Sequence, residues 1–132
     1  MRASSWRTRL VSFNREYTYR AIADFLSSQF QPSSNAHILC DDGTVLALSG
    51  IPPESFCSSV SAPRDREGFL VYLKEKNVEY LVFIDKQDST PARLFPELKQ
   101  GMGNEMFRPV LHASPRFLPA EVYLYRVHAP NK

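Results

Sequence analysis

The pattern of hydrophobic and polar residues first predicts an amphipathic helix near the N-terminus. Its apolar side chains recur at steps of three and four residues, which places them on one face of a helix. They are Tyr19, Ile22, Phe25, Leu26 and Phe30. Pro32 and the polar residues 33–35 end this pattern. The ordered domain is therefore predicted to begin near Asn14.

The next segment combines an apolar run with a polar turn. The run, His37–Cys40, is typical of a short buried strand, and it stops at the polar residues 41–44. Two continuations fit: the turn Asp42-Gly43 leads into a second strand, or one of these polar residues caps a short helix over 44–48. We favour the helix, because Gly50 followed by two prolines is a common helix end.

The middle of the chain contains the segment most clearly typical of a central strand. Residues 56–60 are a candidate edge strand, and a helix capped by Asp65 and ending near Asn77 follows them. The apolar face of that helix consists of Phe69, Leu70 and Leu73. Residues 78–84, VEYLVFI, are almost continuously apolar and rich in β-branched and aromatic side chains. This composition predicts an interior strand covered on both faces.

The last third of the chain predicts one more helix and a pair of strands. The helix begins at Ser89 or Thr90, has Leu94 and Leu98 on its inward face, and ends at Gly101. Two strand-like segments joined by a proline-containing connection close the chain: Phe107–Ala113 and Glu121–Val127.

Strands that alternate with helices before a terminal strand pair predict an α/β fold. We expect a Rossmann-like three-layer sandwich, with a mixed, mainly parallel sheet that ends in an antiparallel strand pair. The domain division is a loose basic leader over 1–13 and a single α/β domain over 14–132. A chain of 132 residues with 43% hydrophobic and 23% charged residues has the composition of a globular domain and needs no metal or disulfide to fold.

Charge and cysteine content narrow the function classes. A formal net charge of +2 is too small to predict a phosphate-binding protein, and we expect no nucleic-acid partner. Several arginines nevertheless lie near the N-terminus. They either contact a membrane surface or an acidic partner, or they belong to a solvated arm.

Two cysteines, Cys40 and Cys57, are too few for a disulfide framework. They are interpreted as buried thiols, with a single bridge as the alternative for a domain outside the cytoplasm. No apolar run is long enough for a transmembrane segment.

Two polar clusters follow the predicted strands at the sheet edge where α/β proteins bind ligands. The candidate ligand-binding residues are Asp41, Asp42, Gly43, Thr44, Asp85, Asp88 and Ser89. If the two strands are neighbours, the four aspartates converge and are able to hold a hard cation. The same residue types also favour turns and helix caps, so both interpretations stay open.

Other chemistry has no signature in the sequence. Dinucleotide binding requires closely spaced glycines after the first strand, and only Gly43 lies there. The histidines lack the spacing of a zinc site, and no spacing pairs one of them with Cys40 or Cys57 as a catalytic base. We therefore predict no cofactor, no resident metal and no catalytic residue.

The order of six segments resembles the soluble C-terminal domain of bacterial polytopic membrane glycosyltransferases, the mannosyltransferase-like GT-C group. The segments are the helix over 19–30, HILCDDGTV, LSGIPP, VEYLVFID, LFPEL and VYLYRV, which together span about residues 17–127. In such enzymes acidic residues in loops between membrane helices perform catalysis, so the resemblance transfers no catalytic residue to this chain.

This resemblance implies a non-catalytic, membrane-associated accessory domain on the extracytoplasmic (periplasmic) face of a bacterial membrane. Its implied partner is a membrane glycosyltransferase core or the lipid-linked substrate, and its implied role is to help position acceptor or donor. One alternative is a small metal-assisted or phosphate-directed enzyme that uses the carboxylates at the strand ends. Another is an interaction module whose leader, with Trp6 and Phe13, docks on a partner.

Overall fold

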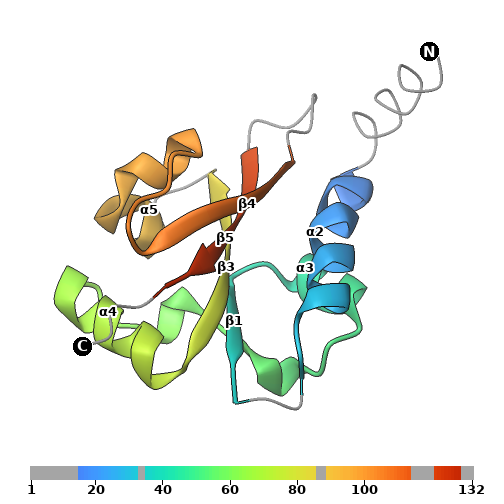
Figure 1. The fold of residues 1–132 in the computed structure, drawn as a ribbon, viewed down its shortest axis with the longest axis horizontal. Coiled ribbons are helices and arrows are strands. Elements are labelled where there is room, and N and C mark those ends of the chain that lie inside the picture. The colour runs from blue at the N-terminus through green and yellow to red at the C-terminus, as the bar shows by residue number, and fades with distance from the viewer. Residues whose placement is uncertain (1–14, 33–34, 86–88, 114–120, 129–132) are drawn as a thin grey trace.

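The computed structural model describes residues 15–32, 35–85, 89–113 and 121–128 (Figure 1). The leader predicted over 1–13 lies outside these residues. Four α-helices are described: α2 (Arg15–Gln29), α3 (Gly43–Ser49), α4 (Arg66–Glu75) and α5 (Thr90–Leu94). Three short 3₁₀ helices accompany them: η1 (Pro53–Ser55), η2 (Ser59–Ser61) and η3 (Pro96–Gln100). The strands are β1 (His37–Cys40), β2 (Phe56–Cys57), β3 (Val78–Asp85), β4 (Phe107–Ala113) and β5 (Glu121–Val127). The α/β fold class is confirmed.

The five strands form one mixed sheet in the order β2-β1-β3-β5-β4. β1 pairs in parallel with β2 and β3, whereas β5 pairs antiparallel with β3 and β4. The prediction of a mainly parallel sheet was therefore wrong. The physical reason is that β5 inserts beside β3, so that it forms a long antiparallel ladder there as well as with its hairpin partner β4.

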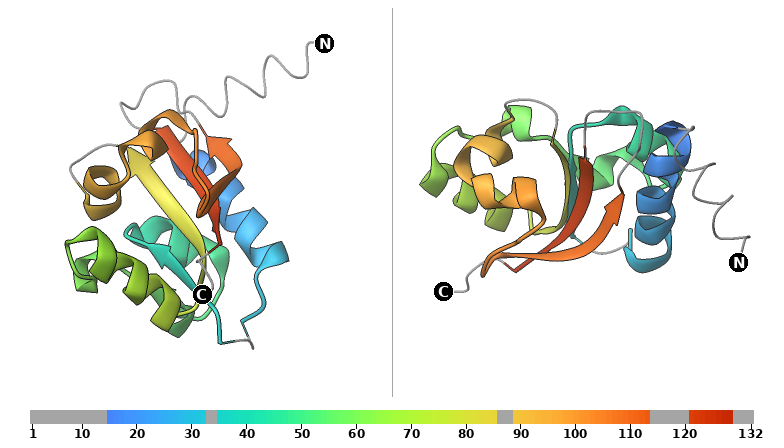
Figure 2. Two further views of the ribbon diagram at one scale, coloured as in Figure 1. Left: turned by 60° about the vertical axis from the view of Figure 1, so that its left-hand side comes forward. Right: turned by 90° about the horizontal axis from the view of Figure 1, so that it is seen from above.

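Helices cover both faces of the sheet, and each face has its own hydrophobic core. Side chains of α2 and α3 pack on one face with alternate residues of β1, β3 and β5. Side chains of α4, α5 and η3 pack on the other face. In Figure 2 the two groups of helices lie on opposite sides of the strands. Because helices cover both faces, the connecting loops lie at the ends of the strands.

The central strand β3 contributes to both cores, as its apolar sequence predicts. Tyr80 and Val82 belong to the core under α2 and α3, whereas Leu81 and Phe83 belong to the core under α4 and α5. All four side chains are buried. Because successive side chains of a strand point to opposite faces, an almost continuous apolar run fits a strand covered on both sides. The prediction of an interior strand is confirmed.

Residues 43–49 are helical, so the hairpin alternative for this segment was wrong. The Asp42 carboxylate accepts a hydrogen bond from the Thr44 backbone N–H at 2.7 Å and so caps α3. Gly50 adopts a left-handed conformation at the C-terminal end (φ 72°), which stops the helix. Local capping therefore decides between the two continuations.

The prediction of one helix from Ser89 to Gly101 was wrong, because the segment divides into α5 and η3. Phe95 lies between them, and its backbone conformation is not helical (φ −132°, ψ 72°). Pro96 explains the break, since a proline disfavours helical geometry in the residue before it and has no N–H to donate. Leu98 is still buried, and the carbonyl of Leu98 accepts a hydrogen bond from Tyr125 Oη at 2.7 Å.

The helices are amphipathic and of moderate length. α2, the longest one described, has 15 residues and buries Ile22, Ala23 and Leu26 while Asp24 stays exposed. Across residues 15–32, 35–85, 89–113 and 121–128, we find no helix with both the length and the apolar character needed to cross a bilayer. The helices instead bury their apolar faces against the sheet.

Gly103 is a position where the fold requires glycine. Its φ is 65°, and a Cβ there would overlap the Phe107 carbonyl oxygen and lie 2.7 Å from Pro109 Cδ. We expect Gly103→Ala to lower the free energy of unfolding by about 2 kcal/mol, measured by urea denaturation. Gly43→Ala is the matched control, because a Cβ at Gly43 meets nothing within 4 Å. Equal stability of both variants would contradict this account of the turn before β4.

Candidate functional site

The candidate site lies at the carboxyl ends of β1 and β3. From β1 the chain passes through α3 to β2 on one side, and from β2 it passes through α4 to β3 on the other side of β1. α3 and α4 pack on opposite faces of the sheet. Such a reversal is a topological switch point, where the loops diverge and open α/β sheets bind their ligands. The residues that follow these strands are therefore the candidates for ligand binding.

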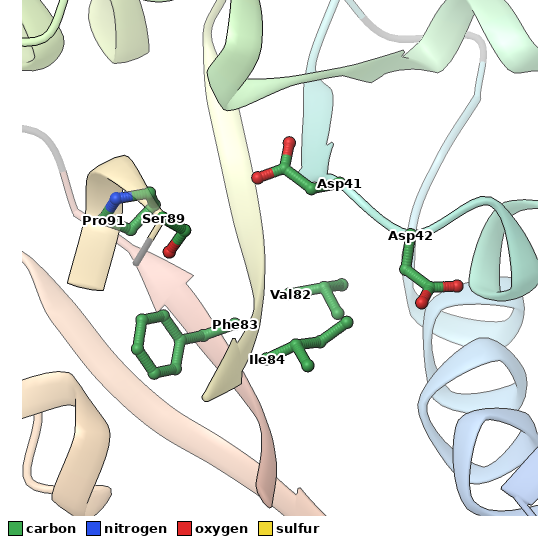
Figure 3. Close-up of a pocket in the computed structure, with 7 residues that line it drawn as sticks. All are labelled: Asp41, Asp42, Val82, Phe83, Ile84, Ser89 and Pro91. Carbon is green, nitrogen blue, oxygen red and sulfur yellow. The ribbon is translucent and has the colours of Figure 1, made fainter. Parts of the chain in front are cut away.

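A crevice occupies this position, and we call it the switch-point crevice. Its first part, of about 120 Å³, is lined by Asp41, Asp42, Val82, Phe83, Ile84, Ser89 and Pro91 (Figure 3). Its second part, of about 550 Å³, is lined by Asp41, Ser59, Val60, Arg64, Ser89, Thr90 and Arg93. Asp41 and Ser89 are common to both parts. The loops that follow three parallel strands thus contribute to one opening.

Asp41 connects the end of β1 to the loop that follows β2. Its Oδ1 accepts hydrogen bonds from Ser58 Oγ and from the Ser59 backbone N–H, each at 2.8 Å. Its Oδ2 accepts one from Ser59 Oγ at 2.5 Å. Hydrogen bonds to a charged acceptor are stronger than those between neutral groups. The carboxylate therefore braces the two neighbouring strand ends.

The other residues of the first polar cluster form the start of α3. Asp42 caps this helix, and its carboxylate points away from that of Asp41 in Figure 3. Gly43 and Thr44 are exposed residues of the first turn. A Cβ at Gly43 would meet no atom within 4 Å, so the turn itself does not require glycine. Of this cluster, Asp41 and Asp42 line the crevice.

The second polar cluster follows β3 and lies within the described residues only in part. Ser89 caps α5, with its Oγ accepting a hydrogen bond from the Ala92 backbone N–H at 3.3 Å, and it lines the crevice. Asp85 ends β3, where its backbone pairs with Glu121. The side chain of Asp85 and the whole of Asp88 lie outside the described residues.

The condition set for a four-aspartate site, that β1 and β3 are neighbours, is met. The site itself stays a prediction, because two of its four carboxylates lie outside the described residues. In the part of the chain with described side chains, no three His, Cys, Asp or Glu residues come together as a metal-binding group. Asp41 and Asp42 have structural hydrogen-bond partners there.

Sequence analysis missed the basic residues of the crevice. Arg64 precedes α4, and Arg93 lies within α5. Both line the second part of the crevice, together with Ser59, Val60 and Thr90. The rule that residues after parallel strands meet at one edge was applied to β1 and β3 but not to β2, which has only two residues. Extending that rule to the loop after β2 would have pointed to Ser59 and Arg64.

The two cysteines are free and lie on opposite faces of the sheet. Cys57 is paired with Leu39 in the β1–β2 register, and both contribute to the core under α4 and α5. Cys40, the next residue of β1, belongs to the opposite core. Burial raises the pKa of the Cys40 thiol to about 12 and also raises the pKa of Cys57. These thiols are packing residues, and the alternative of a Cys40–Cys57 bridge does not fit this geometry.

Two of the three histidines, His37 and His112, lie apart from the crevice. His37 is at the opposite end of β1, where its Nδ1 lies 2.6 Å from the Lys76 carbonyl oxygen. His112 is on β4, at the far edge of the sheet, with its ring stacked on Tyr123 at 4.4 Å between centroids. These positions assign both rings to contacts at the margins of the fold.

The fold and crevice define a small open α/β domain with a ligand-sized opening at its switch point. Comparison with protein families, with curated proteins and with solved structures found no match to this chain. Function is therefore inferred from the residues of the crevice and from the contacts they make.

Replacing Asp41 tests its role as a brace. We expect Asp41→Ala to lower the free energy of unfolding by about 2 kcal/mol, because the variant loses three hydrogen bonds to a charged acceptor. Urea denaturation measures this change. Asp24→Ala, at an exposed position of α2, is the control and should change stability little. An Asp41→Ala protein as stable as the control would show that the hydrogen bonds do not brace the strands.

Burial of the thiols predicts slow chemistry and an alkaline loss of stability. At pH 8 a thiol reagent should modify Cys40 and Cys57 much faster in urea than in the native protein, because burial holds both thiols protonated. A mild oxidant should produce no intramolecular bridge in the folded state. Mass spectrometry after alkylation detects both outcomes, and a bridge in a protein that keeps its native circular dichroism would refute the opposite-face arrangement.

The pH dependence follows from the sign of the same shift. In the unfolded chain Cys40 ionises near the ordinary pKa of 9.0, whereas the folded thiol keeps its proton to about 12. This contribution to stability is therefore complete below pH 9 and falls as the pH rises from 9 toward 12. Cys40→Ala should reduce that alkaline slope in urea denaturation series.

Proposed function

We propose that this chain is a non-catalytic accessory domain similar to the extracytoplasmic C-terminal domain of polytopic membrane glycosyltransferases of the GT-C group. In this role it holds a ligand at the switch-point crevice and helps to position acceptor or lipid-linked donor for a membrane-embedded enzyme. The proposal includes a Rossmann-like relationship, supported by the parallel order β2-β1-β3 with helices on both faces. Location at the outer face of a bacterial membrane is part of the same proposal.

The observation that carries the proposal is the hydrogen bonding of Asp41. This is the carboxylate best placed at the carboxyl end of β1 to serve as a metal ligand or general base. Both its oxygens accept hydrogen bonds from Ser58 and Ser59, which are part of the fold itself. A carboxylate with these partners stabilises the fold. Its use in catalysis would break its hydrogen bonds to the loop after β2. This favours a binding role over catalysis.

The crevice also has the form that a positioning role requires. The larger part, of about 550 Å³, is within the range of small-molecule binding sites, about 300–1,000 Å³. It is built from residues that follow the parallel strands, including two short helices capped by Ser58 and Ser89. A ligand held there would be fixed relative to the whole sheet.

A second candidate function is a small metal-assisted or phosphate-directed enzyme. It is favoured by one observation, that β1 and β3 are neighbours, which places the backbones of Asp41 and Asp85 at the same edge of the sheet. This function requires Asp41 to exchange its serine partners for a cation.

A magnesium titration distinguishes the two functions. Followed by amide NMR on the chain after removal of metals, Mg²⁺ should cause no saturable shifts at Asp41 or Asp42, because these carboxylates keep their protein partners. Purified protein should transfer or hydrolyse no glycosyl group. The proposal also expects hydrophobic spans to be encoded next to this chain in its gene.

The enzyme alternative makes the opposite prediction for the same experiment. Saturable shifts confined to residues 41–44 and 85–90, absent from Asp41→Asn, would favour a cation site and overturn the proposed accessory role. Asp24→Asn is the matched control, since it removes an exposed carboxylate from α2, outside the crevice. Turnover of a glycosyl substrate by the wild-type chain would also overturn it.

A further inference from the structure

Two arginines line the larger part of the switch-point crevice. Arg64 belongs to the loop between η2 and α4, and Arg93 belongs to α5. They reach the same opening because the segments after β2 and β3 both lie at the carboxyl edge of the sheet. Asp41 and Ser89, which border both parts of the crevice, lie on opposite sides of β3 in Figure 3.

These guanidinium groups have hydrogen-bonding capacity to spare. In the described part of the chain Arg64 has no hydrogen-bond or ion-pair partner, and Arg93 donates one long hydrogen bond, 3.5 Å, to Thr90 Oγ1. Arg66 differs, since its guanidinium lies 4.6 Å above the centre of the Phe95 ring. A guanidinium has five N–H donors, so Arg64 and Arg93 leave most of theirs available to a ligand.

Asp41 offsets one of these two positive charges and leaves the other. Among the described residues that line the larger part of the crevice it is the one carboxylate, so these residues together have a formal charge of +1. Ser58 and Ser59 donate to both oxygens of Asp41, so its charge is stabilised within the loop and not by either arginine. The described residues of the opening therefore have a net positive charge, and the carboxylate beside the two arginines accepts its hydrogen bonds from serines.

We propose that the larger part of the switch-point crevice binds a phosphate-bearing ligand through Arg64 and Arg93. Planar guanidinium groups form paired hydrogen bonds with phosphate oxygens, and two of them at one opening match a dianionic phosphomonoester. Thr90 Oγ1 lies beside Arg93 and adds a further hydroxyl donor. The inference rests on the proposed function, because it names the ligand class for the same crevice.

Val60 adds an apolar contact to this site. Its side chain is 87% exposed although it is aliphatic, and it lines the same opening as the arginines. A ligand with a phosphate group and an adjoining less polar part would cover it. Either a soluble phosphorylated compound or a phospholipid headgroup has this chemistry, so the test includes one probe of each kind.

Glucose 1-phosphate is the soluble probe, and glucose is its neutral control. In amide NMR titrations of the full chain we expect saturable shifts at Ser59, Arg64, Thr90 and Arg93 with the phosphate and none with glucose. Arg64→Gln with Arg93→Gln should weaken binding by about tenfold or more, since each removes charged hydrogen bonds. Arg108→Gln, at an exposed position of β4, is the matched control and should bind as the wild type does.

The lipid probe is a phosphatidylcholine vesicle containing phosphatidic acid, compared in sedimentation with phosphatidylcholine alone. Binding that requires phosphatidic acid and is lost in the double glutamine variant identifies a headgroup as the source of the phosphate. Shifts with glucose 1-phosphate without vesicle binding identify a soluble ligand. Both results support the arginine site.

Two results would overturn the inference. One is the absence of saturable shifts and of vesicle binding with either phosphate probe. The other is binding that the double variant retains, or that Arg108→Gln weakens equally, because this would indicate diffuse attraction to surface charge. Neither result bears on the role of Asp41, which the magnesium titration tests. Failure of this inference and failure of the proposed function are therefore distinguishable.

Discussion

Burial of β3 on both faces is the constraint on which the rest of the structure depends. A strand whose successive side chains enter two different cores requires helices on both faces and strand neighbours on both edges. β1 provides a parallel neighbour and β5 an antiparallel one. Once β3 occupies the middle of the sheet, the loops after the parallel strands must meet beyond its carboxyl end.

The crevice follows from this arrangement and from the hydrogen bonds of one carboxylate. Asp41 ties the end of β1 to Ser58 and Ser59, so the loop after β2 is held close to the central strand. That loop continues through η2 to Arg64, which thereby lines the same opening as Arg93 of α5. The carboxylate of Asp41, which has a structural role, thus helps to position Arg64, whose guanidinium is available to a ligand. The functional proposal and the further inference use these two roles separately.

The described acidic residues of the crevice have structural hydrogen-bond partners. From the sequence, Asp41-Asp42 after a strand fits either a cation site or a turn and helix cap. In this fold both carboxylates accept hydrogen bonds from nearby backbone or hydroxyl groups. Among the described residues that line the crevice, the groups with spare hydrogen-bond donors and a positive charge are the guanidiniums of Arg64 and Arg93. These donors are the basis of the proposed phosphate-bearing ligand, which agrees with the proposed role in positioning a substrate.

Local interactions explain how much of the fold could be predicted. The interior strand β3 is recognisable from an uninterrupted apolar run, and the caps Asp42, Asp65 and Ser89 act within three residues of their own positions. The break at Phe95 is local too, and Pro96 is its signal, but the prediction used only the helical spacing of Leu94 and Leu98. Periodicity predicted the inward face correctly for Leu98 but not the continuity of the helix.

The sequence by itself determined which segments become helices and strands, because capping and alternation act between residues close in the chain. Only the tertiary structure decided that β5 inserts beside β3, that Cys40 and Cys57 face opposite cores, and that Arg64 and Arg93 share a crevice. Strand order and the meeting of distant loops depend on which surfaces bury each other. No local pattern encodes that choice, since Asp41 and Ser59 are 18 residues apart and meet only after β1 and β2 pair.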